Sequence, residues 1–199
     1  MKKTPLIVLA ALAAVAVPAH AVTVLTVDLS VENQITISAT SGASDITASG
    51  SDTTGIYLES IFDGPFDASI LDTLISGDLT SAENTSDGSP LLFTSTGFVG
   101  DGLNVWSYTD DPDSEFVTGS QAFSGSATWE IDALAYTALL GGALSGDVYF
   151  PADSADDLAG AVIIGQWERA AVIPVPAAVW LLGSALFGLR LFGARKRSA

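Results

Sequence analysis

Charged and apolar residues occupy different parts of this chain, and this separation limits what it can form. Segment 22–172 holds all 23 acidic residues and a single basic one, Arg169, which gives it a formal charge of −22. The six other basic residues lie at the two ends, beside apolar runs. Because a body this acidic lacks the Lys and Arg side chains that contact phosphates, we expect no nucleic-acid partner.

The first residues have the three-part pattern of a secretory signal peptide. Lys2 and Lys3 form a positive start, an apolar run follows over 6–17, and Ala19 and Ala21 complete a small-x-small cleavage pattern. The apolar run is too short to span a membrane, which argues against an N-terminal anchor. We therefore expect a signal peptide over 1–21, removed by signal peptidase after Ala21.

The C-terminal segment 173–199 combines a proline motif, an apolar run and a basic end. Pro176 suits the first position of a helix, and a transmembrane helix over 176–194 would be roughly 28 Å long, close to the hydrocarbon thickness of a bilayer. Arg190 can reach the headgroups at one end, and Trp180 favours the opposite interface. The basic end should stay in the cytoplasm, which leaves the acidic body outside.

This order of parts resembles a PEP-CTERM sorting signal, in the variant whose motif reads Val-Pro-Leu-Pro-Ala. The motif residues here are Ile173, Pro174, Val175, Pro176 and Ala177, and the basic tail is Arg195, Lys196 and Arg197. Val175 stands where the variant has Leu, Ile173 replaces Val, and Arg190 adds a charge inside the helix. The resemblance covers only about residues 172–199, so it concerns the route of the protein and not the task of its body.

The resemblance implies an exported protein of a Gram-negative bacterium that makes extracellular polysaccharide. It implies a precursor anchored in the inner membrane by the C-terminal helix, with exosortase, an integral-membrane cysteine transpeptidase-like enzyme, as the second processing partner after signal peptidase. The expected destination is the cell surface or the extracellular matrix, with polysaccharide as a further partner.

Between the two ends the dominant pattern is the alternation of apolar and polar residues, which is typical of half-buried strands. It predicts a hairpin with strands over 25–31 and 35–39, and a strand over 123–131 whose buried face carries Phe123, Ala127, Trp129 and Ile131. Further strands are expected over 55–62, 103–109, 147–150 and 161–168, the last being central because it is apolar on both faces. Gly-rich turns between many short strands indicate an antiparallel β-sandwich or jelly roll.

Helix signals in the body are few and short. Asp67 is expected to cap a helix that extends to Ile75, with Gly77 just past its end, and Asp132 to cap one over 133–140. Ser154 and Asp157 have the spacing of a capping box. Segment 38–55 is rich in Ser, Thr, Gly and Ala, and we expect a loop that buries too little apolar surface to order firmly.

Two acidic clusters are candidates for metal binding. Asp110, Asp111, Asp113 and Glu115 form the denser one, and Ca²⁺ would relieve the repulsion among such carboxylates. The cluster lacks the turn glycine and distal glutamate of an EF-hand, so a solvated acidic loop is the alternative to a calcium site. The second cluster covers 153–157, and the same two interpretations, a calcium site or a solvated acidic loop, apply to it.

The body has few residues suited to catalysis. The chain has no cysteine, and its one histidine, His20, belongs to the predicted signal peptide, so the usual general base and nucleophile pairs are missing. We expect no catalytic residue and no resident cofactor. The leading interpretation is an exported, non-enzymatic surface or matrix protein associated with polysaccharide or biofilm.

The sequence is also compatible with two other functions, carbohydrate binding and glycoside hydrolysis. A carbohydrate-binding module would use aromatic side chains on the strands, which otherwise form core. These aromatic residues are Trp106, Tyr108, Trp129, Tyr149 and Trp167. A secreted glycoside hydrolase would use a pair of Asp or Glu side chains, although no local motif singles out such a pair.

Overall fold

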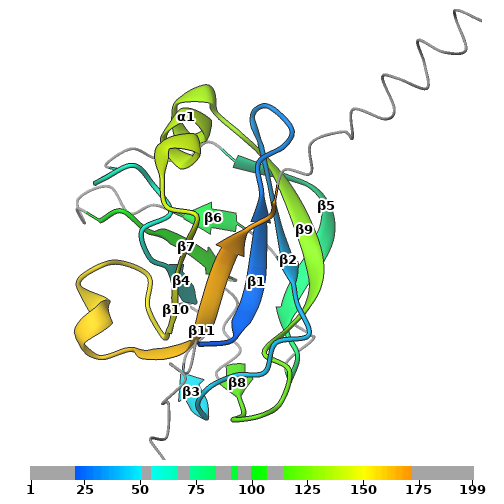
Figure 1. Ribbon diagram of the computed structural model, residues 1–199, viewed down its shortest axis with the longest axis vertical. Helices are drawn as coiled ribbons and strands as arrows, with labels where there is room; N and C mark the ends of the chain where they lie inside the picture. The colour runs from blue at the N-terminus through cyan, green and yellow to red at the C-terminus, as the bar shows by residue number, and fades with distance from the viewer. Residues whose placement is uncertain are drawn as a thin grey trace, which may run out of the picture.

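The computed structural model describes residues 21–50, 55–66, 72–83, 91–93, 100–106 and 114–171, and in them the protein is mainly β (Figure 1). The elements in chain order are β1 (Thr23–Asp28), β2 (Gln34–Ala39), β3 (Ala48–Gly50), β4 (Ile56–Leu58), β5 (Asp72–Ser81), β6 (Leu91–Phe93), β7 (Leu103–Trp106), β8 (Ser114–Phe116), β9 (Phe123–Ile131), α1 (Ala133–Gly141), β10 (Ser145–Phe150), the 3-10 helix η1 (Asp157–Ala159) and β11 (Val162–Arg169). The predicted signal peptide, sorting motif and basic tail lie outside these residues. No helix within them is long and apolar enough to cross a membrane, and the predicted helix over 176–194 is not among them.

One curled, mixed sheet forms a half-barrel. Its strand order is β5-β9-β2-β1-β11-β10-β4-β7-β6, and β3 pairs with β8 in a separate small sheet. Among the described strands β1 and β11 run parallel, whereas the other pairs in the large sheet are antiparallel. The mainly β prediction is confirmed, but the parallel pair differs from the antiparallel β-sandwich or jelly roll expected, because alternation within a strand does not fix which strand lies beside it.

The predicted hairpin and the predicted strand over 123–131 are confirmed. β1 and β2 are antiparallel neighbours, and Asn33, with φ of 57°, helps to turn the chain between them. In β9, Phe123, Ala127, Trp129 and Ile131 are all buried, as the alternation predicts. β11 lies between β1 and β10, which confirms its central position.

The helix predicted from Asp67 to Ile75 is wrong where the structure describes that segment, because residues 72–81 form the strand β5. β5 pairs along its length with β9, and this pairing overrides the local helical pattern. Gly77, expected to end the helix, instead lies where the two strands approach closely. Its φ is +87°, and a Cβ there would lie 2.1 Å from the carbonyl oxygen of Ser126.

The helix predicted after Asp132 is confirmed as α1. The Asp132 carboxylate accepts hydrogen bonds from the backbone N–H groups of Leu134 at 2.9 Å and Ala135 at 3.0 Å. At the other end of the helix Gly142 lies against the 61–62 backbone, where a Cβ would lie 1.9 Å from the Ile61 carbonyl oxygen.

The serine-rich segment 38–55 is more ordered than expected in the residues that the structure describes. β3 pairs with β8, and the Asp45 N–H donates to the Ile164 carbonyl at 3.0 Å. Ser44 is buried, and its hydroxyl donates to the Ile46 carbonyl at 2.7 Å. Backbone pairing, rather than burial of apolar side chains, holds this segment.

The core is rich in aromatic rings. Trp129 and Trp167 are fully buried, and the Trp167 indole N–H donates to the Glu59 carbonyl at 3.0 Å. Phe116 packs edge to face against Phe123 and Phe150, with ring centroids 5.2 and 4.9 Å away. Two of the five aromatic residues considered for sugar stacking are therefore core residues.

Replacing Asp132 tests the capping of α1. Asp132→Ala should lower the free energy of unfolding by about 1 kcal/mol, because two N–H groups lose their acceptor. Asp132→Asn removes the same charge but keeps an acceptor, so it should stay close to wild type. Urea denaturation of the three proteins measures both values. An equal loss in the two variants would mean that the charge, and not the cap, stabilises the helix.

Candidate functional site

Most of the predicted calcium cluster lies outside the described residues. Asp110, Asp111 and Asp113 are not among them, and the backbone of Glu115 lies in β8, opposite Ser49 of β3. In the part of the chain that the structure describes, no three acidic or histidine side chains are grouped so that they could hold a metal ion. Calcium binding at 110–115 stays a prediction.

The second acidic cluster is a hydrogen-bonded turn before β11. The Asp157 carboxylate accepts from the Asp153 N–H at 3.2 Å, and the Ser154 hydroxyl donates to the Asp156 carboxylate at 2.7 Å. The capping box predicted for Ser154 and Asp157 is therefore wrong, because Asp156 is the N-cap residue of η1 and makes no side-chain capping hydrogen bond. Burial raises the pKa of Asp153, and the nearby Asp157 and Asp156 add to this, while the hydrogen bond from Ser154 opposes it.

A third group of acids comes together from distant parts of the sequence. This group, the Glu59 cluster, consists of Glu59, Asp101, Asp147, Tyr57 and Tyr149. The Glu59 N–H donates to the Asp147 carbonyl at 3.1 Å across neighbouring strands. Each of the two aspartates has its own donor outside the cluster, as Ser60 donates its hydroxyl to Asp101 at 3.2 Å and Gln166 its amide to Asp147 at 3.0 Å.

Burial is the main influence on the raised pKa values in the Glu59 cluster, and neighbouring negative charges add to it. Burial raises the pKa of Glu59, and the charges of Asp147 and Asp101 raise it further. Burial likewise raises the pKa of Tyr149, with Glu59 and Asp147 as the next causes. The pKa of Tyr57 rises to about 12, mainly through burial, although the Gly102 N–H donates to its hydroxyl at 2.9 Å.

A carboxyl group whose pKa is raised by burial and by neighbouring acids is the arrangement that general acid catalysis uses. The Glu59 cluster is therefore the best-supported place for acid–base chemistry among the described residues. Sequence reasoning missed it, because its acids are single residues in separate segments. Their proximity arises from the order β11-β10-β4-β7, which no local pattern encodes.

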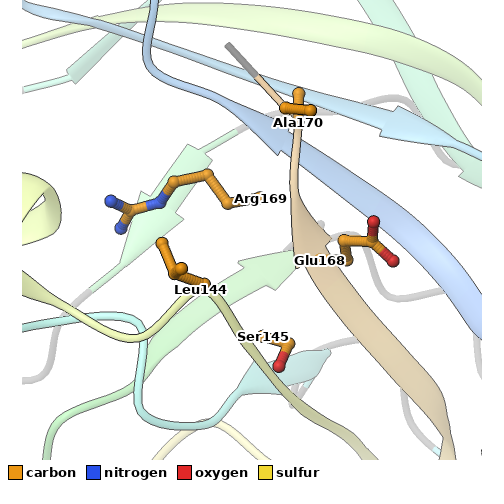
Figure 2. A pocket seen from close by; sticks show the side chains of 6 residues that line it. Leu144, Ser145, Glu168, Arg169 and Ala170 are labelled. Carbon is orange, nitrogen blue, oxygen red and sulfur yellow. The ribbon is translucent and has the colours of Figure 1, made fainter.

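A hollow of about 480 Å³ lies elsewhere, at the end of β11 (Figure 2). It is lined by Leu144, Ser145, Glu168, Arg169, Ala170 and Ala171. Figure 2 shows the side chains of Glu168 and Arg169 on opposite sides of the strand, as expected for consecutive strand residues. None of the lining residues belongs to the Glu59 cluster, so the hollow and the crowded acids are separate features.

Arg169, the only basic residue of the acidic body, caps the C-terminal end of α1. Its guanidinium donates to the carbonyl of Leu139 and, at 3.2 Å, to that of Leu140, both in the last turn of α1. A cation at this end of a helix satisfies free carbonyls and opposes the negative end of the helix dipole. Burial lowers the pKa of Arg169.

A comparison of the chain with protein-family models, with curated proteins and with solved structures finds no match.

Glu59→Gln tests the strain of crowded acids. Because the pKa of Glu59 is raised in the folded state, its favourable contribution is present below the unfolded-state pKa and is lost as pH rises through the folded-state pKa. At neutral pH the variant should melt at a higher temperature than wild type. The free energy of unfolding should rise by less than about 1 kcal/mol, because Glu59 is partly exposed to solvent. This gain in stability should vanish below about pH 4.

Glu130→Gln is the matched control, since it removes one exposed acid of β9. Melting temperatures across the acid range measure both variants. An equal gain in both would assign the effect to the net charge of the body and not to the Glu59 cluster.

Arg169→Met should lower the free energy of unfolding by about 1 to 2 kcal/mol, because two carbonyls of α1 lose their donors. Arg169→Lys keeps the charge but loses the planar pair of donors, so its loss should be smaller. Chemical denaturation in high salt measures both, since salt screens the change in net charge. A stability of Arg169→Met equal to wild type would contradict the assigned role.

Proposed function

We propose that this chain is an exported, non-enzymatic surface or matrix protein of a Gram-negative bacterium, sorted by exosortase into surroundings rich in polysaccharide. One observation carries the proposal: the proline motif, apolar run and basic tail over 173–199 directly follow a body that has a single basic residue. The charge distribution thus divides the chain into two terminal targeting segments and an acidic body.

The positions of the strands support this division. β1 begins at Thr23, two residues after the proposed cleavage at Ala21, and β11 ends at Arg169, before the motif that begins at Ile173. Removal of both ends would therefore take no strand from the described sheet. The core aromatic residues and the cap of α1 also lie between the two processing points.

The charge of the body suits an extracellular role. An excess of negative charge keeps a protein soluble but makes the folded chain repel itself. Salt screens this repulsion beyond about 8 Å at physiological ionic strength. We propose that the body works in saline surroundings or beside cations that bridge it to an anionic polysaccharide.

A secreted Asp/Glu-dependent glycoside hydrolase is the second candidate, and the Glu59 cluster is the observation that favours it. Release of reducing sugar that disappears in Glu59→Gln would distinguish the hydrolase from a structural protein. A carbohydrate-binding module has less support, because Trp129 and Trp167 are buried. Quenching of tryptophan fluorescence by polysaccharide would support a carbohydrate-binding function.

The intact mass of the mature protein tests the proposed sorting. In a Gram-negative host that has exosortase, the mass should correspond to loss of residues 1–21 and of the C-terminal helix with its basic tail. In the same host without the enzyme the C-terminal segment should be retained. The double variant Pro174→Ala/Pro176→Ala, which alters the motif alone, should also retain it.

Retention of Trp180 to Ala199 in the host that has the enzyme would overturn the proposal of sorting and would leave a permanent membrane anchor. Export without loss of residues 1–21 would overturn the cleavage proposed after Ala21.

A further inference from the structure

Helix α1 has a composition unusual for a surface helix. Its sequence, ALAYTALLG, contains no charged residue and has apolar side chains on all sides. Ala135 and Leu139 are buried in the core, but Leu134 is 64% exposed and Leu140 is 50% exposed. A helix that is apolar all round normally lies wholly inside a protein or against lipid.

Neighbouring segments extend this apolar surface. The Tyr136 hydroxyl of α1 donates to the Leu29 carbonyl at 2.9 Å, which places the turn between β1 and β2 beside the helix (Figure 1). That turn carries Val31, which is 53% exposed, and the connection from α1 to β10 carries Leu144, which is 69% exposed. We call this end of the molecule the α1 pole; it comprises α1, the turn 29–33, residues 142–144 and the end of β11.

The most exposed large apolar side chains lie at this pole, whereas Ile75 of β5, which is 48% exposed, and Val22, which is 40% exposed, lie outside it. Leu144, Leu134, Val31 and Leu140 are the four most exposed of the large hydrophobic side chains in the described part of the chain. Ile163 and Ile46, which lie toward the opposite end of β11, are 39% and 40% exposed. Four exposed apolar side chains at one end of a polyanionic body are unusual, although Glu32 in the turn 29–33 is also exposed there.

The chain leaves the body at the same pole. β11 ends at Arg169, which is bonded to the last turn of α1, and Ala170 and Ala171 line the hollow there. Residues 170–175 separate this strand from Pro176, the first residue of the predicted transmembrane helix. Even fully extended, they span at most roughly 20 Å. An inserted tail would therefore hold the α1 pole close to the bilayer surface.

We propose that the α1 pole contacts the lipid bilayer while the precursor is anchored by its tail. This inference rests on the proposed function, because it needs the tail to be inserted. The exposed leucines would enter the boundary between headgroups and acyl chains, where apolar side chains leave water. Contact would also fix the orientation of the body relative to the membrane.

Single cysteines test the contact, since the chain has none of its own. Leu134→Cys and Leu144→Cys place a label at the α1 pole. Ile46→Cys and Ile163→Cys are matched controls at partly exposed apolar positions away from it. The full chain, from which the signal peptide has been removed, is labelled with an environment-sensitive fluorophore and reconstituted into phosphatidylcholine vesicles. Quenching by a quencher attached to the lipid is then measured in vesicles purified by flotation.

The labels at positions 134 and 144 should be quenched severalfold more than those at 46 and 163. Equal quenching at all four positions in protein that floats with the vesicles would overturn the contact while leaving the anchoring intact. Protein that does not float would overturn the anchoring itself. A different result would be that, in detergent, the labels at positions 134 and 144 become less accessible to a water-soluble quencher as the protein concentration rises. That result would assign the α1 pole to contact with a second copy of the chain and would overturn contact with lipid.

Discussion

The parallel pairing of β1 with β11 holds the sheet together. On one side of this pair lie β2, β9 and β5, on the other β10, β4, β7 and β6, and within each half the described strands are antiparallel. Gly165 allows the two strands to pack closely, because a Cβ added there would lie 2.6 Å from a methyl carbon of Val24 and 2.9 Å from the Val22 carbonyl oxygen. Without this contact the two halves would share no hydrogen-bonded edge in the described sheet.

The pairing also joins residues that are far apart in the sequence, with Thr23 opposite Gln166 and Val27 opposite Arg169. Contacts of such long range form slowly, because a large loop must close before they contribute. The sheet cannot be completed until the last strand is available. This topology is compatible with the proposed export, in which the chain would fold after crossing the membrane.

Local patterns predicted local structure well. The β1–β2 hairpin, the buried face of β9 and the cap at Asp132 each depend on residues close in sequence, and each is confirmed. β5 was mistaken for a helix because the spacing of Leu74 and Ile75 with Gly77 fits a helix end, while its partner β9 lies far along the chain. The order of strands, and with it the Glu59 cluster, depends on such distant partners and has no local signal.

The same difference explains why the candidate sites were unevenly predicted. Runs such as 153–157 can be recognised in the sequence because their acids are adjacent. Glu59, Asp101 and Asp147 are separate acids among the 23, and only the fold brings them near one another. The role of Arg169 was equally hidden, since it depends on the carbonyls of a helix that ends many residues earlier.

The placement of Arg169 has a consequence for the persistence of the protein. With both ends removed, the body would offer a trypsin-like protease one site, the bond between Arg169 and Ala170. In the folded protein the N–H groups on both sides of this bond are engaged, Arg169 with the Leu144 carbonyl at 2.7 Å and Ala170 with the Val27 carbonyl at 2.8 Å. A protease needs that backbone extended and free, so cleavage would require local unfolding of the central strand. The backbone hydrogen bonds of Arg169 and Ala170 thereby protect the one peptide bond at which this class of enzyme would cut.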